Sequence, residues 1–264
     1  MRRPEKSLFL FLIAAAIGFG PAAADEAADK GLSIAREADQ RDTGFGDASA
    51  TLQMILRNRH GDQTTRQMRS RTLEVLEDGD KSLMIFDDPA DVKGTSFLSF
   101  SHKEGDDDQW LYLPALKRVK RISSSNKSGP FMGSEFSYED LSSQEVEKYA
   151  YQYLRDENFD DRDHFVIERI PVDKKSGYRR QITWIDQEEY RVWKVEFYDR
   201  KDSLLKTLAF ADYKRYLDKH WRASQLDMVN HQTGKSTTLR FEDYIFGNGY
   251  ADDDFNRNSL AKAR

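Results

Sequence analysis

Cysteine is absent from the 264 residues of this chain. Disulfide bonds, thiolate metal ligands and a cysteine nucleophile are therefore excluded. The absence also excludes attachment of a lipid to a cysteine behind an export signal. Any covalent or metal chemistry must come from other residue types.

Signature motifs for catalysis and nucleotide binding are also missing. The sequence has no G-x-S-x-G elbow, no G-x-G-x-x-G turn and no P-loop. Its five histidines do not form H-x-x-x-H or E-x-x-H pairs, and its acidic runs lack the spaced ligands of a calcium loop. We therefore expect no catalytic residue, no metal and no cofactor, and we do not expect an enzyme.

Long apolar runs are confined to the N-terminus. Three basic residues precede an apolar run at 8–19, which is too short to span a membrane, and Ala22-Ala23-Ala24 resembles a signal-peptidase site. We expect residues 1–24 to be a cleaved secretory signal peptide and residues 25–264 to form a single domain. An uncleaved anchor is the alternative. The mature protein is expected in the bacterial periplasm.

The charge balance is mildly acidic. The formal net charge is −5, and the predicted signal peptide carries three basic residues and one acidic residue, so its removal leaves −7. Such a protein is a poor general binder of polyanions. Nucleic acid is therefore not expected as a partner.

After a predicted helix at 27–41, the sequence changes to a period of two at about residue 49, which is typical of half-buried strands. Asp78-Gly79 predicts a two-residue hairpin, because both positions tolerate positive φ. The regular spacing favours a mainly β, antiparallel sandwich or barrel. A short helix is predicted at 252–260. The expected strands after the first are 65–76, 82–86, 95–102, 109–114, 118–122, 149–154, 164–170, 179–186, 191–198, 204–213, 221–230 and 236–245.

The strand patterns leave two interpretations of the interior. Trp193, Val195 and Phe197 share one face of a strand, and Leu208 with Phe210 share a face of the next one. A curled sheet would bring such residues together. The interior is then either a packed core or an apolar pocket, and the residue pattern alone leaves both open.

Two segments between residues 114 and 141 carry distinctive side chains. Arg118, Lys120 and Arg121 form a basic cluster, which is either a docking patch for an acidic partner or an edge strand protected by charge. Phe131 and Phe136 lie in a glycine-marked loop that is too apolar to stay exposed. This loop is either a lid over a cavity or a plug that completes the core.

A long composite of motifs resembles a known family. It comprises Asp88-Pro89 with Lys93-Gly94-Thr95, the run WLYLPA at 110–115, Lys117-Arg118 with Arg121-Ile122, and the run FMGSEFSYEDL at 131–141. These residues resemble the outer-membrane lipoprotein-sorting, LolA-like proteins of bacteria, and the likeness extends loosely over 49–250. Glu135 departs from the pattern, in which we expect aspartate.

The resemblance implies a half-open, strongly curved antiparallel sheet, an unclosed barrel, with a helix and a loop as lid. It also implies a periplasmic carrier of lipid or of the acyl chains of lipoproteins, with transient membrane contact. An inner-membrane transporter and an outer-membrane acceptor are the expected partners. The alternatives are a periplasmic accessory subunit with a filled core and a hydrolase of lipid or glycan.

The carrier hypothesis assigns roles to two groups of residues. Arg118, Lys120 and Arg121 are expected to contact a partner or a lipid headgroup. Aromatic residues on strands are expected to line the pocket, and residues 131–136 are expected to contribute to its lid. The predicted lipid-binding residues are Trp110, Tyr112, Phe131, Met132, Phe136, Trp184, Trp193 and Phe197.

Overall fold

The computed structural model describes residues 21–262, which form one helix, thirteen strands and several short 3₁₀ turns. Residues 1–20, most of the predicted signal peptide, lie outside the described part. The strands are β1 (Asp47–Arg57), β2 (Gln63–Leu73), β3 (Lys81–Asp88), β4 (Ser96–Phe100), β5 (Asp108–Leu113), β6 (Arg118–Ile122), β7 (Tyr149–Phe159), β8 (Arg162–Pro171), β9 (Tyr178–Asp186), β10 (Val192–Asp199), β11 (Leu204–Tyr216), β12 (His220–Asn230) and β13 (Ser236–Phe246).

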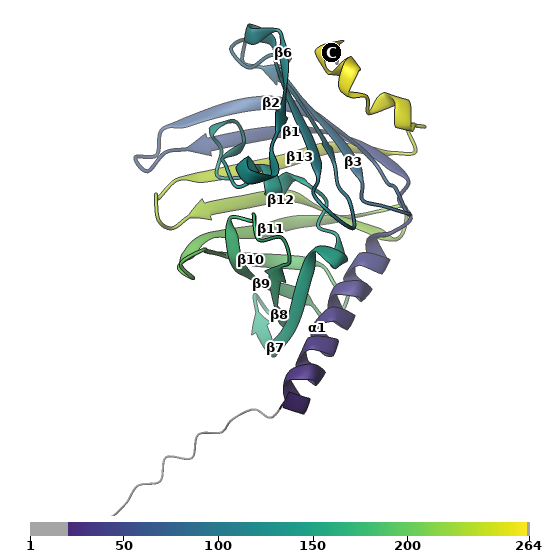
Figure 1. Ribbon diagram of the computed structural model, residues 1–264, viewed down its shortest axis with the longest axis vertical. Coiled ribbons are helices and arrows are strands. Elements are labelled where there is room, and N and C mark those ends of the chain that lie inside the picture. The colour runs from purple at the N-terminus through teal and green to yellow at the C-terminus, as the bar shows by residue number, and fades with distance from the viewer. Residues whose placement is uncertain (1–20, 263–264) are drawn as a thin grey trace, which may run out of the picture.

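All thirteen strands of the described part belong to one antiparallel sheet, in the order β6-β5-β4-β3-β2-β1-β13-β12-β11-β10-β9-β8-β7. Two meanders, β1–β6 and β7–β13, meet where β1 pairs with β13. Within residues 21–262, β6 and β7 remain the two edges, so the sheet curves without closing (Figure 1). The predicted mainly β, half-open and unclosed architecture is confirmed.

Residues 123–148, which we call the crossing segment, connect the two edges of the sheet. Because β6 and β7 are consecutive in the chain but lie at opposite edges, the segment must pass across the hollow of the curved sheet. It does so through four 3₁₀ turns, at Ser124–Asn126, Phe131–Gly133, Tyr138–Leu141 and Val146–Lys148. The topology therefore places the predicted aromatic loop on the concave face.

The aromatic residues of the crossing segment are packed as core. Phe131 is 0% exposed and lies 5.1 Å from Phe97 and 5.9 Å from Phe86 between ring centroids. Phe136 is 2% exposed. The buried ion pair between Asp140 and Lys206 of β11 fastens the segment to the sheet. The buried aromatic side chains agree with the plug alternative for this loop.

Helix α1 (Pro21–Asp42) begins six residues before the predicted start and packs along β7 at one end of the sheet (Figure 1). Its buried stripe contains Gly31, Ile34 and Ala35. A Cβ at Gly31 would lie 2.7 Å from the backbone nitrogen of Tyr153. Glycine therefore allows close contact with β7. None of the described helices is long and apolar enough to cross a membrane.

The other face of the sheet, the convex face, has its own apolar cluster. Leu83, Leu98 and Trp110 pack there against Phe255 and Leu260 of the C-terminal segment. The predicted C-terminal helix is wrong in type, since the chain forms two 3₁₀ turns at Asp252–Asp254 and Arg257–Lys262. This segment covers an apolar patch that would otherwise face water.

The hairpin prediction at Asp78-Gly79 is wrong in its geometry. The connection between β2 and β3 spans residues 74–80, and neither Asp78 nor Gly79 has positive φ. Glycine is required at position 79 for another reason, because an added Cβ would lie 2.6 Å from the carbonyl carbon of Ser101. The Asp78-Gly79 pair thus correctly predicted a turn between two strands, but not the type of turn.

Candidate functional site

A cavity of about 810 Å³ opens on the concave face, between the sheet, α1 and the crossing segment. Its volume lies within the range of about 300–1,000 Å³ that is common for small-molecule sites. Alternate residues of β10 to β13 form its apolar wall, because successive side chains of a strand point to opposite faces. The apolar wall residues of these four strands are Val192, Val195, Phe197, Leu208, Phe210, Leu226, Leu239 and Phe241.

The crossing segment and α1 complete the enclosure. Phe136 and Leu141 contribute apolar surface from the crossing segment, and Ala35 and Ala38 do so from the helix. The apolar contact of helix α1 with the sheet is a small cluster in which Ile34 packs with residues of β7, β8 and β9, and Arg41 and Asp42 add polar contacts with Glu188 and Arg222. The cavity is thus covered by one tightly fastened segment and by one helix with a narrow apolar contact.

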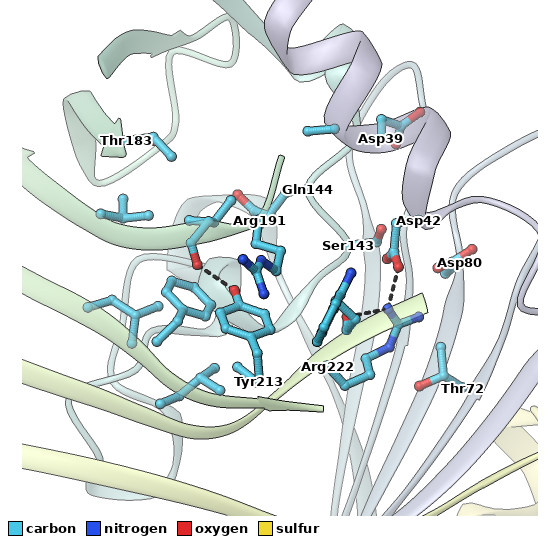
Figure 2. Close-up of a pocket in the computed structure, with 18 of the residues that line it drawn as sticks. Asp39, Asp42, Thr72, Asp80, Ser143, Gln144, Thr183, Arg191, Tyr213 and Arg222 are labelled. Atoms are coloured by element: carbon cyan, nitrogen blue, oxygen red, sulfur yellow. Dashed lines mark hydrogen bonds and ion pairs between the residues drawn. The ribbon is translucent and has the colours of Figure 1, made fainter. Parts of the chain in front are cut away.

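One end of the cavity, near the turn between β9 and β10, presents an arginine among aromatic rings. The Nε of Arg191 donates to Oδ2 of Asp186 at 2.8 Å, and the guanidinium carbon lies 4.6 Å from the ring of Trp221. Tyr213 lies beside it and donates its hydroxyl to the carbonyl of Val192. Figure 2 shows Arg191 and Tyr213 together in this part of the cavity.

The carboxylate of Asp186 accepts several hydrogen bonds beneath this arginine. Asp186 is 1% exposed, and its carboxylate accepts hydrogen bonds from the indole of Trp193 at 2.8 Å and from the backbone amide of Glu189 at 2.7 Å. Burial alone would raise the pKa of Asp186, but these bonds and the one from Arg191 together lower it. The carboxylate therefore stays ionised and fixes the guanidinium in place.

The other end of the cavity, beside the C-terminus of α1, carries carboxylates. Asp39, Asp42 and Asp80 line it (Figure 2). Asp42 pairs with Arg222 of β12. Burial raises the pKa of Asp80 to about 7, and burial also raises the pKa of Asp39. The cavity therefore has a basic and aromatic end, an apolar wall and an acidic end.

Two polar groups in the cavity wall lack a partner. Oγ1 of Thr183 and Nε1 of Trp221 are buried, and neither forms a hydrogen bond with any residue in the described range 21–262. A buried unpaired donor or acceptor costs about 1–3 kcal/mol, so such groups commonly indicate a missing partner. Within the same range, no group of three His, Asp or Glu residues has a geometry suited to a metal ion.

Two of the eight predicted lipid-binding residues, Phe136 and Phe197, line the cavity. Trp110 packs on the convex face beneath the C-terminal segment, and Tyr112 packs against the same cluster. Trp184 also lies on the convex face, where Nζ of Lys194 is 3.5 Å from its ring centroid. The neighbours of these three residues along each strand point inward. Trp110, Tyr112 and Trp184 were therefore assigned from the sequence to the wrong face of the sheet.

The other three predicted residues lie close to the enclosure but outside the cavity lining. Trp193 occupies an irregularity in the pairing of β10 with β9, which turns its ring toward Tyr213 at a centroid distance of 5.1 Å. Phe131 and Met132 belong to the crossing segment, and their side chains pack into the core of the sheet. Their predicted role in binding lipid stays a prediction.

The basic residues predicted as a contact surface lie on the edge strand β6. Arg118, Lys120 and Arg121 are all exposed, and Arg121 pairs with Asp108. Arg118 and Lys120 have no ion-pair partner within residues 21–262. This arrangement leaves both earlier interpretations in place: a contact surface or a charged edge that resists pairing with other strands.

Sequence reasoning missed Arg191, Trp221 and Arg222. Arg191 was assigned to a strand, and nothing in the sequence indicated that its neighbours would be Trp221 and Asp186. These contacts depend on the pairing of β11 with β12, in which Arg215 lies opposite Trp221. The signal available in the sequence was the density of arginine and aromatic residues between 190 and 222.

Comparison with known proteins gives consistent results. A family model described only as an uncharacterized protein matches residues 78–262. The chain is 62% identical to a protein from Vibrio parahaemolyticus described as an outer-membrane lipoprotein-sorting protein domain, over 89% of this chain and 99% of that one, with a TM-score of 0.87. No curated protein matches.

Two further solved structures are similar. A DUF1329 family protein from Desulfovibrio piger is 32% identical over 89% of this chain and 99% of that one, with a TM-score of 0.84. A LolA superfamily protein from Nitrosomonas europaea has a TM-score of 0.70 at 20% identity, over 86% of this chain and 98% of that one. The similarity to the Nitrosomonas europaea protein shows a shared fold.

Proposed function

The chain belongs to the LolA-like family of outer-membrane lipoprotein-sorting proteins, and on that premise we propose that it carries lipid or the acyl chains of lipoproteins across the periplasm. The cavity of about 810 Å³ on the concave face is the observation that supports this proposal. Its wall is apolar over four neighbouring strands, and its cover is a helix with a narrow contact.

The physical requirement for a carrier is simple. Exposing an acyl chain to water costs about 0.8 kcal/mol per CH₂, so ten methylene groups cost roughly 8 kcal/mol. Free diffusion between two membranes is therefore rare without shelter. The side chains of Val195, Leu208 and Leu226 offer such shelter, and they are contributed by three adjacent strands.

The cover suggests a route for the cargo. The crossing segment is fixed by the buried pair Asp140–Lys206, whereas α1 contacts the sheet through an apolar stripe centred on Gly31 and Ile34 and through the ion pair of Asp42, 54% exposed, with Arg222. We therefore assign loading and release to movement of α1. Membrane contact, an inner-membrane transporter and an outer-membrane acceptor belong to this proposal, with Arg118 and Lys120 on the exposed edge as candidate contacts.

The proposal includes processing of the chain. We expect cleavage after Ala24, which would leave Asp25 as the first residue of a single mature domain in the periplasm. The cut falls within the first turn of α1 as described. The rest of the helix, including its contact with β7, would remain.

A periplasmic accessory subunit with a filled interior is the second candidate. The burial of Phe131 favours it, because the crossing segment fills part of the hollow. The remaining cavity favours the carrier. The buried carboxylate of Asp186, which lies behind the cavity lining, is fully engaged with Arg191 and Trp193.

Organic extraction and mass spectrometry of the mature protein, purified from periplasm without detergent, test the proposal. A stoichiometric lipid or acylated peptide is the expected result. An empty protein that also fails to take up a fluorescent fatty-acyl probe would overturn the carrier function and favour the accessory subunit.

A further inference from the structure

The basic end of the cavity has hydrogen-bond donors that the protein itself does not use. A guanidinium carries five N–H bonds, and in residues 21–262 the side chain of Arg191 uses only its Nε, on Asp186. Its side chain is 14% exposed, and it lines the cavity. Four N–H bonds on the terminal nitrogens are thus available in a largely desolvated place.

The position of this guanidinium is set from several sides. The carboxylate of Asp186 fixes Nε, while the rings of Trp221, Trp193 and Tyr213 lie 4.6, 5.4 and 5.5 Å from the guanidinium carbon. An arginine held between aromatic rings and a carboxylate loses little additional side-chain entropy when a ligand binds. The donors are therefore preorganised.

Trp221 supplies a second donor at the same end. Its Nε1 is buried without a hydrogen-bond partner in the described range, and the residue lines the cavity. An indole nitrogen can only donate, so the missing partner must be an acceptor. Tyr213 is not a competing donor, because its hydroxyl is directed to the carbonyl of Val192.

The local charges limit what kind of acceptor fits. Arg191, Arg215 and Arg41, which binds the carbonyl of Glu188, are cations that line the cavity near this end, and the neighbouring carboxylates are Asp186, Glu189 and Glu37, the ion-pair partner of Arg41. Three positive charges are thus accompanied by three negative ones, so there is no surplus of cations for a polyanion. A single negative charge, received by the free donors, suits the site better.

The apolar wall begins directly beside these donors. Val192 follows Arg191 in the chain and lines the cavity, and Val195 and Leu208 continue the wall along β10 and β11. The carboxylates Asp39 and Asp80 lie at the opposite end, beside α1 (Figure 2). A ligand with its charge at Arg191 would thus extend its chain over apolar surface.

We propose that the β9–β10 end of the cavity binds the monoanionic headgroup of a single-chain lipid through the terminal nitrogens of Arg191 and the indole N–H of Trp221. This inference rests on the proposed carrier function and adds the class of cargo. A fatty-acid carboxylate and a lysophospholipid phosphodiester share the required chemistry.

The test compares three ligands with the same sixteen-carbon saturated chain: palmitate, palmitoyl-lysophosphatidylglycerol and the neutral hexadecanol. Each competes with a neutral pyrene-labelled alcohol for the mature protein. The expected result is that one or both anions bind about tenfold or more tightly than hexadecanol, as hydrogen bonds to a charged group imply. The two anionic arms distinguish a carboxylate from a phosphodiester.

Two variants locate the headgroup. Trp221→Phe keeps an aromatic ring and removes the N–H, so the preference for the anion should fall several-fold while hexadecanol binding stays unchanged. Arg191→Gln should abolish the preference. Arg162→Gln is the matched control, because Arg162 also stacks on Trp193, at 4.1 Å, but lies outside the cavity lining.

The outcomes separate the two proposals. If the unmodified protein binds neither the pyrene-labelled alcohol nor any of the three ligands, the carrier function fails. If hexadecanol binds as tightly as both anions, or if Trp221→Phe and Arg191→Gln leave the preference intact, the carrier function survives and the headgroup site is refuted. Thermal unfolding of each variant identifies any loss that comes from misfolding, and Trp221→Phe decides the question if Arg191→Gln does not fold.

Discussion

Lys206 and Asp140 form a buried ion pair in which Nζ lies 2.6 Å from Oδ2, with side chains 4% and 5% exposed. The same Nζ donates to the carbonyl of Glu135, and the hydroxyl of Tyr178 donates to the other oxygen of Asp140 at 2.8 Å. The pair connects β11 to the crossing segment. Its full set of partners explains how two charges remain buried there.

Removal of one member of this pair is expected to be costly. Lys206→Met should lower the free energy of unfolding by about 3–5 kcal/mol, because it leaves Asp140 buried without a cation. Urea denaturation followed by circular dichroism measures the loss. The double variant Lys206→Met with Asp140→Asn should recover part of it, and a loss below about 1 kcal/mol in the single variant would contradict the expected role.

Gly31→Ala tests the contact between α1 and β7. Alanine normally stabilises a helix interior by about 1 kcal/mol relative to glycine. Here the new Cβ would lie 2.7 Å from the nitrogen of Tyr153, so we expect a lower melting temperature and faster amide exchange in α1. Ser33→Ala, on the exposed face of the same helix, is the control and should not destabilise the protein. Equal behaviour of the two variants would disprove close packing.

Asp80 should make stability depend on pH. Burial raises the pKa of Asp80 to about 7 from its ordinary value of 3.8, the amide of Val75 opposes this shift, and nearby Glu145, Glu74 and Asp42 add to it. The folded protein therefore binds this proton more tightly than the unfolded chain. The contribution of Asp80 to stability is present at pH 4 and is lost as the pH rises to 7.

Asp80→Asn keeps an oxygen acceptor for the amide of Val75 and removes the titration. The variant is expected to exceed the unmodified protein in stability at pH 8, by on the order of 2–4 kcal/mol, and to match it at pH 4. Asp78→Asn is the control, because the hydrogen bond with His102 lowers the pKa of Asp78 to about 2, and removing this carboxylate should not raise stability at pH 8. Unfolding free energies across this pH range decide the matter, and an unchanged pH profile in Asp80→Asn would refute the assignment.

Filling the cavity should block uptake of an acyl chain. Leu226 lines the cavity and pairs with Leu239 and Phe210 in neighbouring strands, so Leu226→Trp places a larger ring in the space. Binding of a fluorescent acyl probe should weaken about tenfold or more. Val229→Trp, on the same strand at a residue 42% exposed, is the matched control and should bind normally. Similar binding by both variants would place the acyl chain elsewhere.

The strands were predictable because their alternation and spacing are local properties. All thirteen appear close to their expected positions, and β6 has the predicted bounds, Arg118–Ile122. β7 is longer than expected, at Tyr149–Phe159, because its polar second half is stabilised by pairing with β8 rather than by its own apolar pattern. The family resemblance supplied the half-open curvature that the alternation left undecided.

The cavity was harder to predict, because alternation identifies two faces of a strand without showing which one is concave. Trp110 and Trp184 were assigned inward for their size, yet each packs on the convex face, under the C-terminal segment or beside Lys194. Arg191 depends on contacts with Trp221, thirty residues further along the chain, and on the irregular pairing at Trp193. Such long-range geometry leaves no local pattern in the sequence.

The pairing of β1 with β13 has a consequence for how the protein is made. A chain that is synthesised N-terminus first delivers β1–β6 well before residues 236–246 emerge. Until then, one side of β1 is an open row of backbone donors and acceptors, which readily pairs with other chains. Safe assembly therefore requires protection of this nascent edge until β13, the last strand to arrive, pairs with it.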